Sequence, residues 1–159
     1  MTTIETTAAQ VDTRLLRIPG SADLALVLLT WPAGEGAMLH AEVLRDLAHR
    51  LREFAAVGDI SGLVICAAST DREVAELRIE GSAPAETLAE LLAVPPMPVV
   101  VVLDGVRGPE VAALVRLGAH VVCGSRQGDL PGSARVERID LSGRALVDFV
   151  VQRERAVRA

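Results

Sequence analysis

The chain has 159 residues, half of them apolar, and a formal net charge of -5 at neutral pH. This length favours one domain with a sizeable core, and the acidic balance argues against a nucleic-acid partner because phosphate contacts need a basic surface. No apolar run reaches the roughly 18 residues that span a bilayer, and no basic segment precedes a hydrophobic one at the N-terminus. We therefore expect a cytoplasmic protein with no membrane partner.

The N-terminal part of the chain predicts a tail followed by a hairpin. Residues 1–12 are rich in Thr and Ala without a sustained period, which predicts a flexible tail. A single domain is then expected over residues 13–159. Its first two strands are separated by Pro19-Gly20-Ser21, and such a turn-forming cluster predicts that they pair as a hairpin.

Periodicity predicts strands that alternate with helices over the rest of the domain. Short β-branched runs indicate buried strands, whereas apolar residues at spacings of three and four indicate amphipathic helices. The expected strands are 14–18, 24–30, 62–68, 72–79, 99–103, 120–123 and 135–141, and the expected helices are 39–57, 82–93, 108–118 and 143–157. This alternation predicts an α/β fold with a mainly parallel sheet and right-handed crossovers.

Several kinds of site are excluded or disfavoured by the residues present. No glycine-rich dinucleotide motif follows the first strand, and no P-loop motif occurs in the sequence. Cys66 and Cys123 each lie in an apolar run, which predicts two buried reduced thiols and neither a disulfide nor a metal pair. His120 enters an apolar strand with no carboxylate nearby in the sequence, so we expect it to be structural. No metal site is predicted.

The segment from Val94 to Ser125 reads VPPMPVVVVLDGVRGPEVAALVRLGAHVVCGS. It resembles the central segment of the enoyl-CoA hydratase/isomerase (crotonase) family. In that family a proline-led strand ends in Asn-Gly, a triglycine turn follows, and a helix begins with a catalytic Glu. The resemblance implies a crotonase-like fold with a mainly parallel sheet and a truncated C-terminal helical region. It implies no cofactor, although an acyl-CoA would be a possible ligand.

The resemblance also implies that the family's catalytic groups are degenerate here. Crotonases stabilise an enolate with two backbone N–H groups, and the first donor position falls at Glu76 and Leu77, where the family has small residues. The second falls at Pro109 and Glu110, where proline has no N–H to donate and the carboxylate adds negative charge near the oxyanion. Ungapped alignment puts Ala113 at the position of the first catalytic Glu.

Three other carboxylates remain as weak candidates. Asp104 ends the central strand, at the edge of the sheet where α/β sites lie, although a turn-forming Asp before Gly105 explains it equally well. Glu110 suits the first turn of a helix, which favours a stabilising role over a catalytic one. Glu137 is the nearest candidate for the second catalytic Glu, but its position among charged residues predicts a solvated side chain.

Three hypotheses for function follow from these residues and from the resemblance. The first is a non-catalytic or degenerate crotonase-fold accessory or structural subunit, associated with acyl-CoA or polyketide-type biosynthesis and with a protein partner or a homo-oligomer. The alternative is an active acyl-CoA-processing enzyme, such as an enoyl-CoA hydratase, isomerase or decarboxylase, that uses Asp104 or Glu110. The third is a small regulatory interaction domain whose central strands do not follow the crotonase order.

Overall fold

The described part of the chain forms one mixed sheet with helices on both of its faces. The computed structural model describes residues 10–18, 20–30, 41–57, 60–68, 98–106, 111–128, 130 and 136–158. The strands are β1 (Gln10–Leu16), β2 (Asp23–Thr30), β3 (Ile60–Ala68), β4 (Val99–Asp104), β5 (His120–Cys123) and β6 (Val136–Arg138). The helices are α1 (Ala41–Val57), α3 (Val111–Leu117) and α4 (Gly143–Arg158).

The strands lie in the sheet in the same order as in the sequence, from β1 to β6. β1 pairs antiparallel with β2, as the hairpin prediction requires, and every later pair of neighbours is parallel. Each parallel connection therefore moves one strand along the sheet, with α1 between β2 and β3 and α3 between β4 and β5. This topology confirms the predicted α/β class with a mainly parallel sheet.

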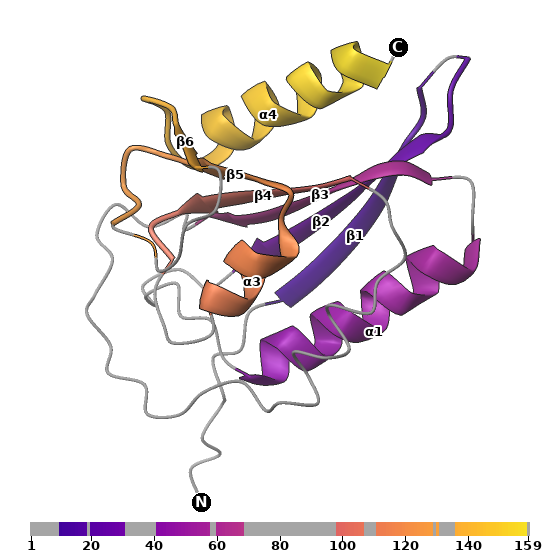
Figure 1. Cartoon of the computed structure of the whole chain (residues 1–159), viewed down its shortest axis with the longest axis horizontal. Coiled ribbons are helices and arrows are strands. Elements are labelled where there is room, and N and C mark those ends of the chain that lie inside the picture. Colours follow the sequence, from indigo (N-terminus) through magenta and orange to yellow (C-terminus); the bar gives the residue numbers. More distant parts are fainter. Residues whose placement is uncertain are drawn as a thin grey trace, which may run out of the picture.

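Two hydrophobic cores fill the two faces of the sheet. Figure 1 shows α1 and α3 on one face and α4 on the other. Because successive strand residues point to opposite faces, Val101 and Leu103 of β4 belong to the first core, whereas Val100 and Val102 belong to the second. All six residues of β4 are buried, which confirms the prediction of a central strand covered on both sides.

Some element boundaries differ from those predicted. β1 begins at Gln10, inside the segment that the composition predicted as a tail. β6 ends at Arg138, before the predicted end at 141, although main-chain hydrogen bonds continue from Ile139 to Cys123 and from Ser125 to Leu141. The elements predicted at 72–79 and 82–93 lie outside the described residues. Among the described helices, none combines the length and the apolar character needed to cross a membrane.

The two cysteines are buried on opposite faces of the sheet. Cys66 packs in the core beneath α4, and Cys123 packs in the core beneath α1 and α3. The sheet lies between the two sulfur atoms, so the thiols do not pair with each other in this fold. Burial raises the pKa of both thiols and thereby disfavours the reactive thiolate.

The buried thiols predict slow modification of the folded protein. With Ellman's reagent, both cysteines should react at least about 100-fold more slowly than a free cysteine, because reaction requires local opening of the fold. In denaturant both should react at the ordinary rate. Rapid reaction of one thiol per chain in the native protein would contradict this placement of the cysteines.

Candidate functional site

The carboxyl end of the central strand carries a wholly buried carboxylate, Asp104. The main-chain N–H of Arg126 donates a hydrogen bond to Oδ1 at 3.0 Å. Nε and Nη2 of Arg126 donate to Oδ2 at 3.0 and 2.7 Å, and the main-chain N–H of Gly143 donates to Oδ2 at 2.7 Å. One side chain therefore joins the end of β4, the turn after β5 and the start of α4.

Local backbone geometry brings these groups together. β4 and β5 are parallel neighbours, so the residues that follow β5 lie beside the end of β4. Gly105 has a φ of 74°, which allows the chain to turn directly after Asp104. Gly124 passes so close to the carboxylate that an added Cβ would lie 2.5 Å from Oδ1 of Asp104. This approach requires glycine.

A buried amide reinforces the same edge of the sheet. Nε2 of Gln127 donates to the carbonyl of Val106 at 3.0 Å, and the N–H of Val106 donates to Oε1 of Gln127 at 3.0 Å. Nη1 of Arg138 donates to the Gln127 carbonyl at 3.1 Å. The buried polar groups of this edge are thus paired, and the turns after β4 and β5 are tied together.

The chemistry open to Asp104 is limited by these contacts. Its two oxygens accept four hydrogen bonds, three of them from Arg126, whose guanidinium also balances the carboxylate charge. A negative charge beside the first amide of α4 also interacts favourably with the helix dipole. To accept a proton from a substrate, Asp104 would have to give up several of these bonds. The geometry favours the structural interpretation of this residue.

Among the residues that the resemblance implies for the active site, the structure describes Ala113 but not the others. Ala113 lies in α3 and is buried in the core on the α1 side of the sheet, where its methyl group offers no acid or base. Glu76, Leu77, Pro109 and Glu110 lie outside the described residues, so the degenerate oxyanion positions stay predictions. Within the described ranges, no three His, Cys, Asp or Glu side chains gather as metal ligands.

A second polar cluster lies where β5, β6 and α4 meet. Nε2 of His120 and Oε1 of Glu137 are 2.8 Å apart, and Nη1 of Arg153 donates to Oε2 of Glu137 at 2.8 Å. The Arg153 guanidinium also lies 5.5 Å from the ring centre of Phe149. The sequence predicted a solvated Glu137 and a structural His120 with no carboxylate nearby in the sequence. The structure pairs them because their strands are neighbours, although they are 17 residues apart in the chain.

The Glu137 cluster predicts a small dependence of stability on pH. Hydrogen bonds from Arg153 and then from His120 hold the pKa of Glu137 below its ordinary 4.5. The charged form therefore stabilises the fold above that pH, and the contribution is lost as the pH falls through the lower pKa of the folded state. The side chain is partly exposed, so solvent screening limits the effect to less than about 1 kcal/mol.

Glu137→Gln tests this contribution. The variant should be less stable than the wild type near neutral pH, and the gap should close in acid, as measured by urea unfolding across that range. Glu53→Gln, at an exposed pair with His49 on α1, is the matched control. A gap between Glu137→Gln and wild type that stays constant down to acid pH would contradict the argument.

Comparisons with known proteins find similarity only at the level of structure. No family model and no curated protein matches the chain. It is similar to a solved protein of Streptomyces avermitilis assigned as an enoyl-CoA hydratase, with 20% identity and a TM-score of 0.47 over 80% of this chain and 49% of that one. A Mycobacterium thermoresistibile protein with the same assignment is 16% identical, with a TM-score of 0.49 over 80% of this chain and 52% of that one.

A third solved structure is an enoyl-CoA hydratase/carnitine racemase from Magnetospirillum magneticum. It is 12% identical, with a TM-score of 0.47 over 91% of this chain and 57% of that one. The chain thus spans about half the length of the solved structures that it matches. These structures carry the name of the family that the segment from Val94 to Ser125 resembles, and the likeness concerns the fold alone.

Proposed function

We propose that this chain is a crotonase-fold accessory or structural subunit without hydratase activity, acting beside an enzyme of acyl-CoA or polyketide-type biosynthesis. The main observation behind the proposal is the burial and the hydrogen bonding of Asp104. This carboxylate is the best-placed candidate base at the edge of the sheet, and it is wholly buried and bonded to Arg126 and Gly143. A carboxylate held in this way stabilises the fold and is poorly suited to proton transfer.

The residue at the implied catalytic position also supports a non-catalytic role. General acid–base catalysis needs a titratable group in contact with the reacting atoms. Ala113, which the resemblance places at the first catalytic Glu, contributes only a methyl group to the core. Pro109 and Glu110 at the implied second oxyanion donor are equally unsuited to stabilise an enolate. A role through contact with another protein accounts for this combination better than a role in chemistry.

The surface of α4 offers apolar side chains to a partner. Phe149, one of two phenylalanines in the chain, is 43% exposed, and Val157 on the same helix is also exposed. Aromatic residues are enriched at protein interfaces because they bury large areas at low entropic cost. These residues fit a protein partner or a second copy of this chain.

Co-expression with the products of adjacent genes tests the accessory role. We expect this chain to co-purify with one of these enzymes or to raise its turnover, and Phe149→Ser to weaken the association more than Ala145→Ser, an exposed substitution on the same helix. A monomer that neither co-purifies with these enzymes nor changes their rates would overturn the proposal.

Calorimetric titration with a series of acyl-CoAs separates this role from catalysis. The accessory role predicts no turnover of any acyl-CoA by the purified chain. Saturable micromolar binding together with turnover, both abolished by Glu110→Ala, would instead establish an active acyl-CoA-processing enzyme. Glu110 is suited to this test because Asp104→Ala is expected to disturb the fold itself.

A further inference from the structure

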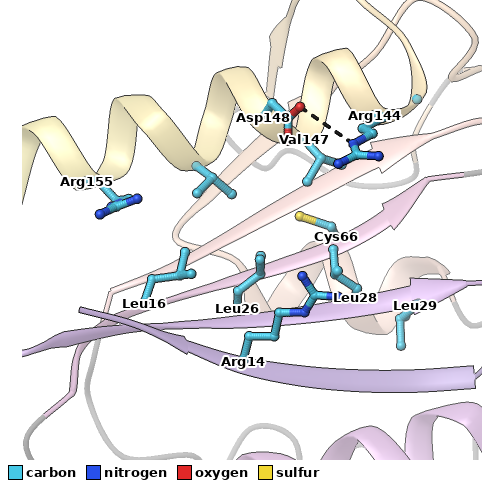
Figure 2. A pocket seen from close by; sticks show the side chains of 12 residues that line it. Arg14, Leu16, Leu26, Leu28, Leu29, Cys66, Arg144, Val147, Asp148 and Arg155 are labelled. Carbon is cyan, nitrogen blue, oxygen red and sulfur yellow. Dashed lines mark ion pairs between the residues drawn. The ribbon is translucent and has the colours of Figure 1, made fainter. Parts of the chain in front are cut away.

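A pocket of about 450 Å³ opens between α4 and the strands β1, β2 and β3 (Figure 2). It lies within the size range of small-molecule sites. Its apolar lining comes from both sides, with Leu16, Leu26 and Leu28 on the hairpin strands and Val147 and Val151 on α4. α4 packs on β3 and β4, so Leu16 and Leu28 of the hairpin strands are left partly uncovered, whereas Leu26 is buried. We call this space the α4 pocket.

The lining of the α4 pocket is positively charged in an acidic protein. Arg14, Arg144 and Arg155 line it, and Asp148 is the one acid among the lining residues that the structure describes. The chain as a whole carries a net charge of -5. Guanidinium groups beside an apolar surface therefore favour an anion here although the molecule as a whole repels one.

Among the described residues, two of these arginines are held only by exposed ion pairs. Nη2 of Arg14 lies 3.5 Å from Oδ2 of Asp12, and Nε of Arg144 lies 3.9 Å from Oδ2 of Asp148. The Arg144 side chain is 93% exposed and that of Arg14 is 63% exposed. Exposed pairs of this kind contribute little to stability, so both guanidinium groups can turn to a ligand at small cost. In Figure 2 the Arg14 side chain rises from β1 toward α4.

The pattern on α4 separates apolar from basic positions. Arg144, Val147, Val151 and Arg155 follow each other at spacings of three and four, so they form one stripe along the helix that faces the pocket. The stripe is apolar in the middle and basic at both ends, which lie about 16 Å apart along the helix axis. An elongated apolar group fits the middle, and an acidic group fits either end.

We propose that the α4 pocket binds an amphipathic anion, namely a medium-length hydrocarbon chain that carries a terminal carboxylate or phosphate. The pocket lies on the face of the sheet opposite to α1 and α3, so it is separate from Ala113, which packs in the core on the other face. The inference does not depend on the accessory role, since a ligand could bind here whether or not the chain has a protein partner.

Isothermal titration calorimetry with decanoate and with decyl phosphate, each below its micelle concentration, tests the proposal. We expect saturable 1:1 binding of at least one of them, and the stronger binder identifies the head group. Decanol, which has the same tail without the charge, should bind at least about 10-fold more weakly, because charge-assisted hydrogen bonds to guanidinium groups contribute to affinity. Absence of saturable binding of both anions to the folded protein, or equal binding of decanol, would overturn the proposal.

Charge-reversal variants locate the binding. Arg14→Glu and Arg144→Glu should each weaken binding by at least about 10-fold, and both side chains are exposed enough for the fold to tolerate the change. Arg45→Glu, at an exposed position on α1 on the other face of the sheet, should leave affinity unchanged. Amide shifts in NMR spectra should change on β1, β2 and α4 and not on α1. Binding that is insensitive to both pocket variants, or shifts centred on α1, would contradict the assignment.

Discussion

Replacing Asp104 with alanine is expected to lower the free energy of unfolding by about 3 to 5 kcal/mol, the range seen when one partner of a buried ion pair is removed. The carboxylate is wholly buried, and the change takes away the acceptor of the Gly143 amide as well as that of the Arg126 main chain and guanidinium. Buried donors that lose their acceptor retain the full cost of desolvation.

Urea unfolding followed by far-UV circular dichroism measures this loss. Asp104→Asn keeps the size of the side chain and one acceptor oxygen, so its effect should be smaller than that of alanine. Asp46→Ala removes an exposed carboxylate that pairs with Arg50 on α1, and it should cost less than about 1 kcal/mol. A loss below about 1 kcal/mol for Asp104→Ala would show that these bonds do not hold the fold together.

The same variant separates the two interpretations of Asp104. A catalytic base can be removed with loss of activity and little loss of stability, because catalytic groups need contact with substrate and not with the core. A structural carboxylate shows the reverse pattern. The four hydrogen bonds to Asp104 predict a structural role. The primary effect of Asp104→Ala should therefore be a lower unfolding midpoint.

Gly124→Ala is expected to destabilise the protein by about 2 kcal/mol or more through steric crowding. The added Cβ would lie 2.5 Å from Oδ1 of Asp104 and 2.7 Å from Cδ2 of Leu146. Neither neighbour can move freely, since Asp104 is fixed by its hydrogen bonds and Leu146 is wholly buried in the core beneath α4. The methyl group would therefore push the start of α4 away from the sheet.

Gly128→Ala is the matched control for this substitution. Gly128 follows the same turn, but nothing lies within 4 Å of the position that its Cβ would take. Thermal unfolding should show a large drop in midpoint for Gly124→Ala and almost none for Gly128→Ala. Equal stability of the two variants would mean that the edge of the sheet can relax around the added methyl group.

Much of the fold could be predicted because its signals are local. The Pro19-Gly20-Ser21 cluster predicts the hairpin, the apolar spacing in α1 predicts its buried face, and the uninterrupted β-branched run of β4 predicts a strand covered on both sides. The boundaries were less accurate where a neighbouring strand decides them. β6 ends where its regular pairing with β5 ends at Cys123, and β1 gains residues from its pairing with β2.

The partners of the site residues could not be predicted in the same way. Asp104 was placed at the carboxyl end of the central strand, where it lies, but Arg126 is 22 residues away and Gly143 is 39 residues away. Their proximity follows from the order of the strands, which no local pattern in the sequence encodes. The pairing of His120 with Glu137 depends on the same non-local information. Once β4, β5 and β6 are taken as consecutive parallel neighbours, each contact becomes foreseeable.

The bond between Asp104 and the first amide of α4 also bears on how the chain folds. It joins positions 39 residues apart, so the face of the sheet beneath α4 stays open to water until the residues after 143 have been synthesised and docked. Contacts of such long sequence separation slow folding, because the loop must close before the contact can stabilise it. During that interval Val100, Val102 and Val122 present a continuous apolar surface. During synthesis, docking of α4 therefore competes with aggregation through this exposed apolar surface.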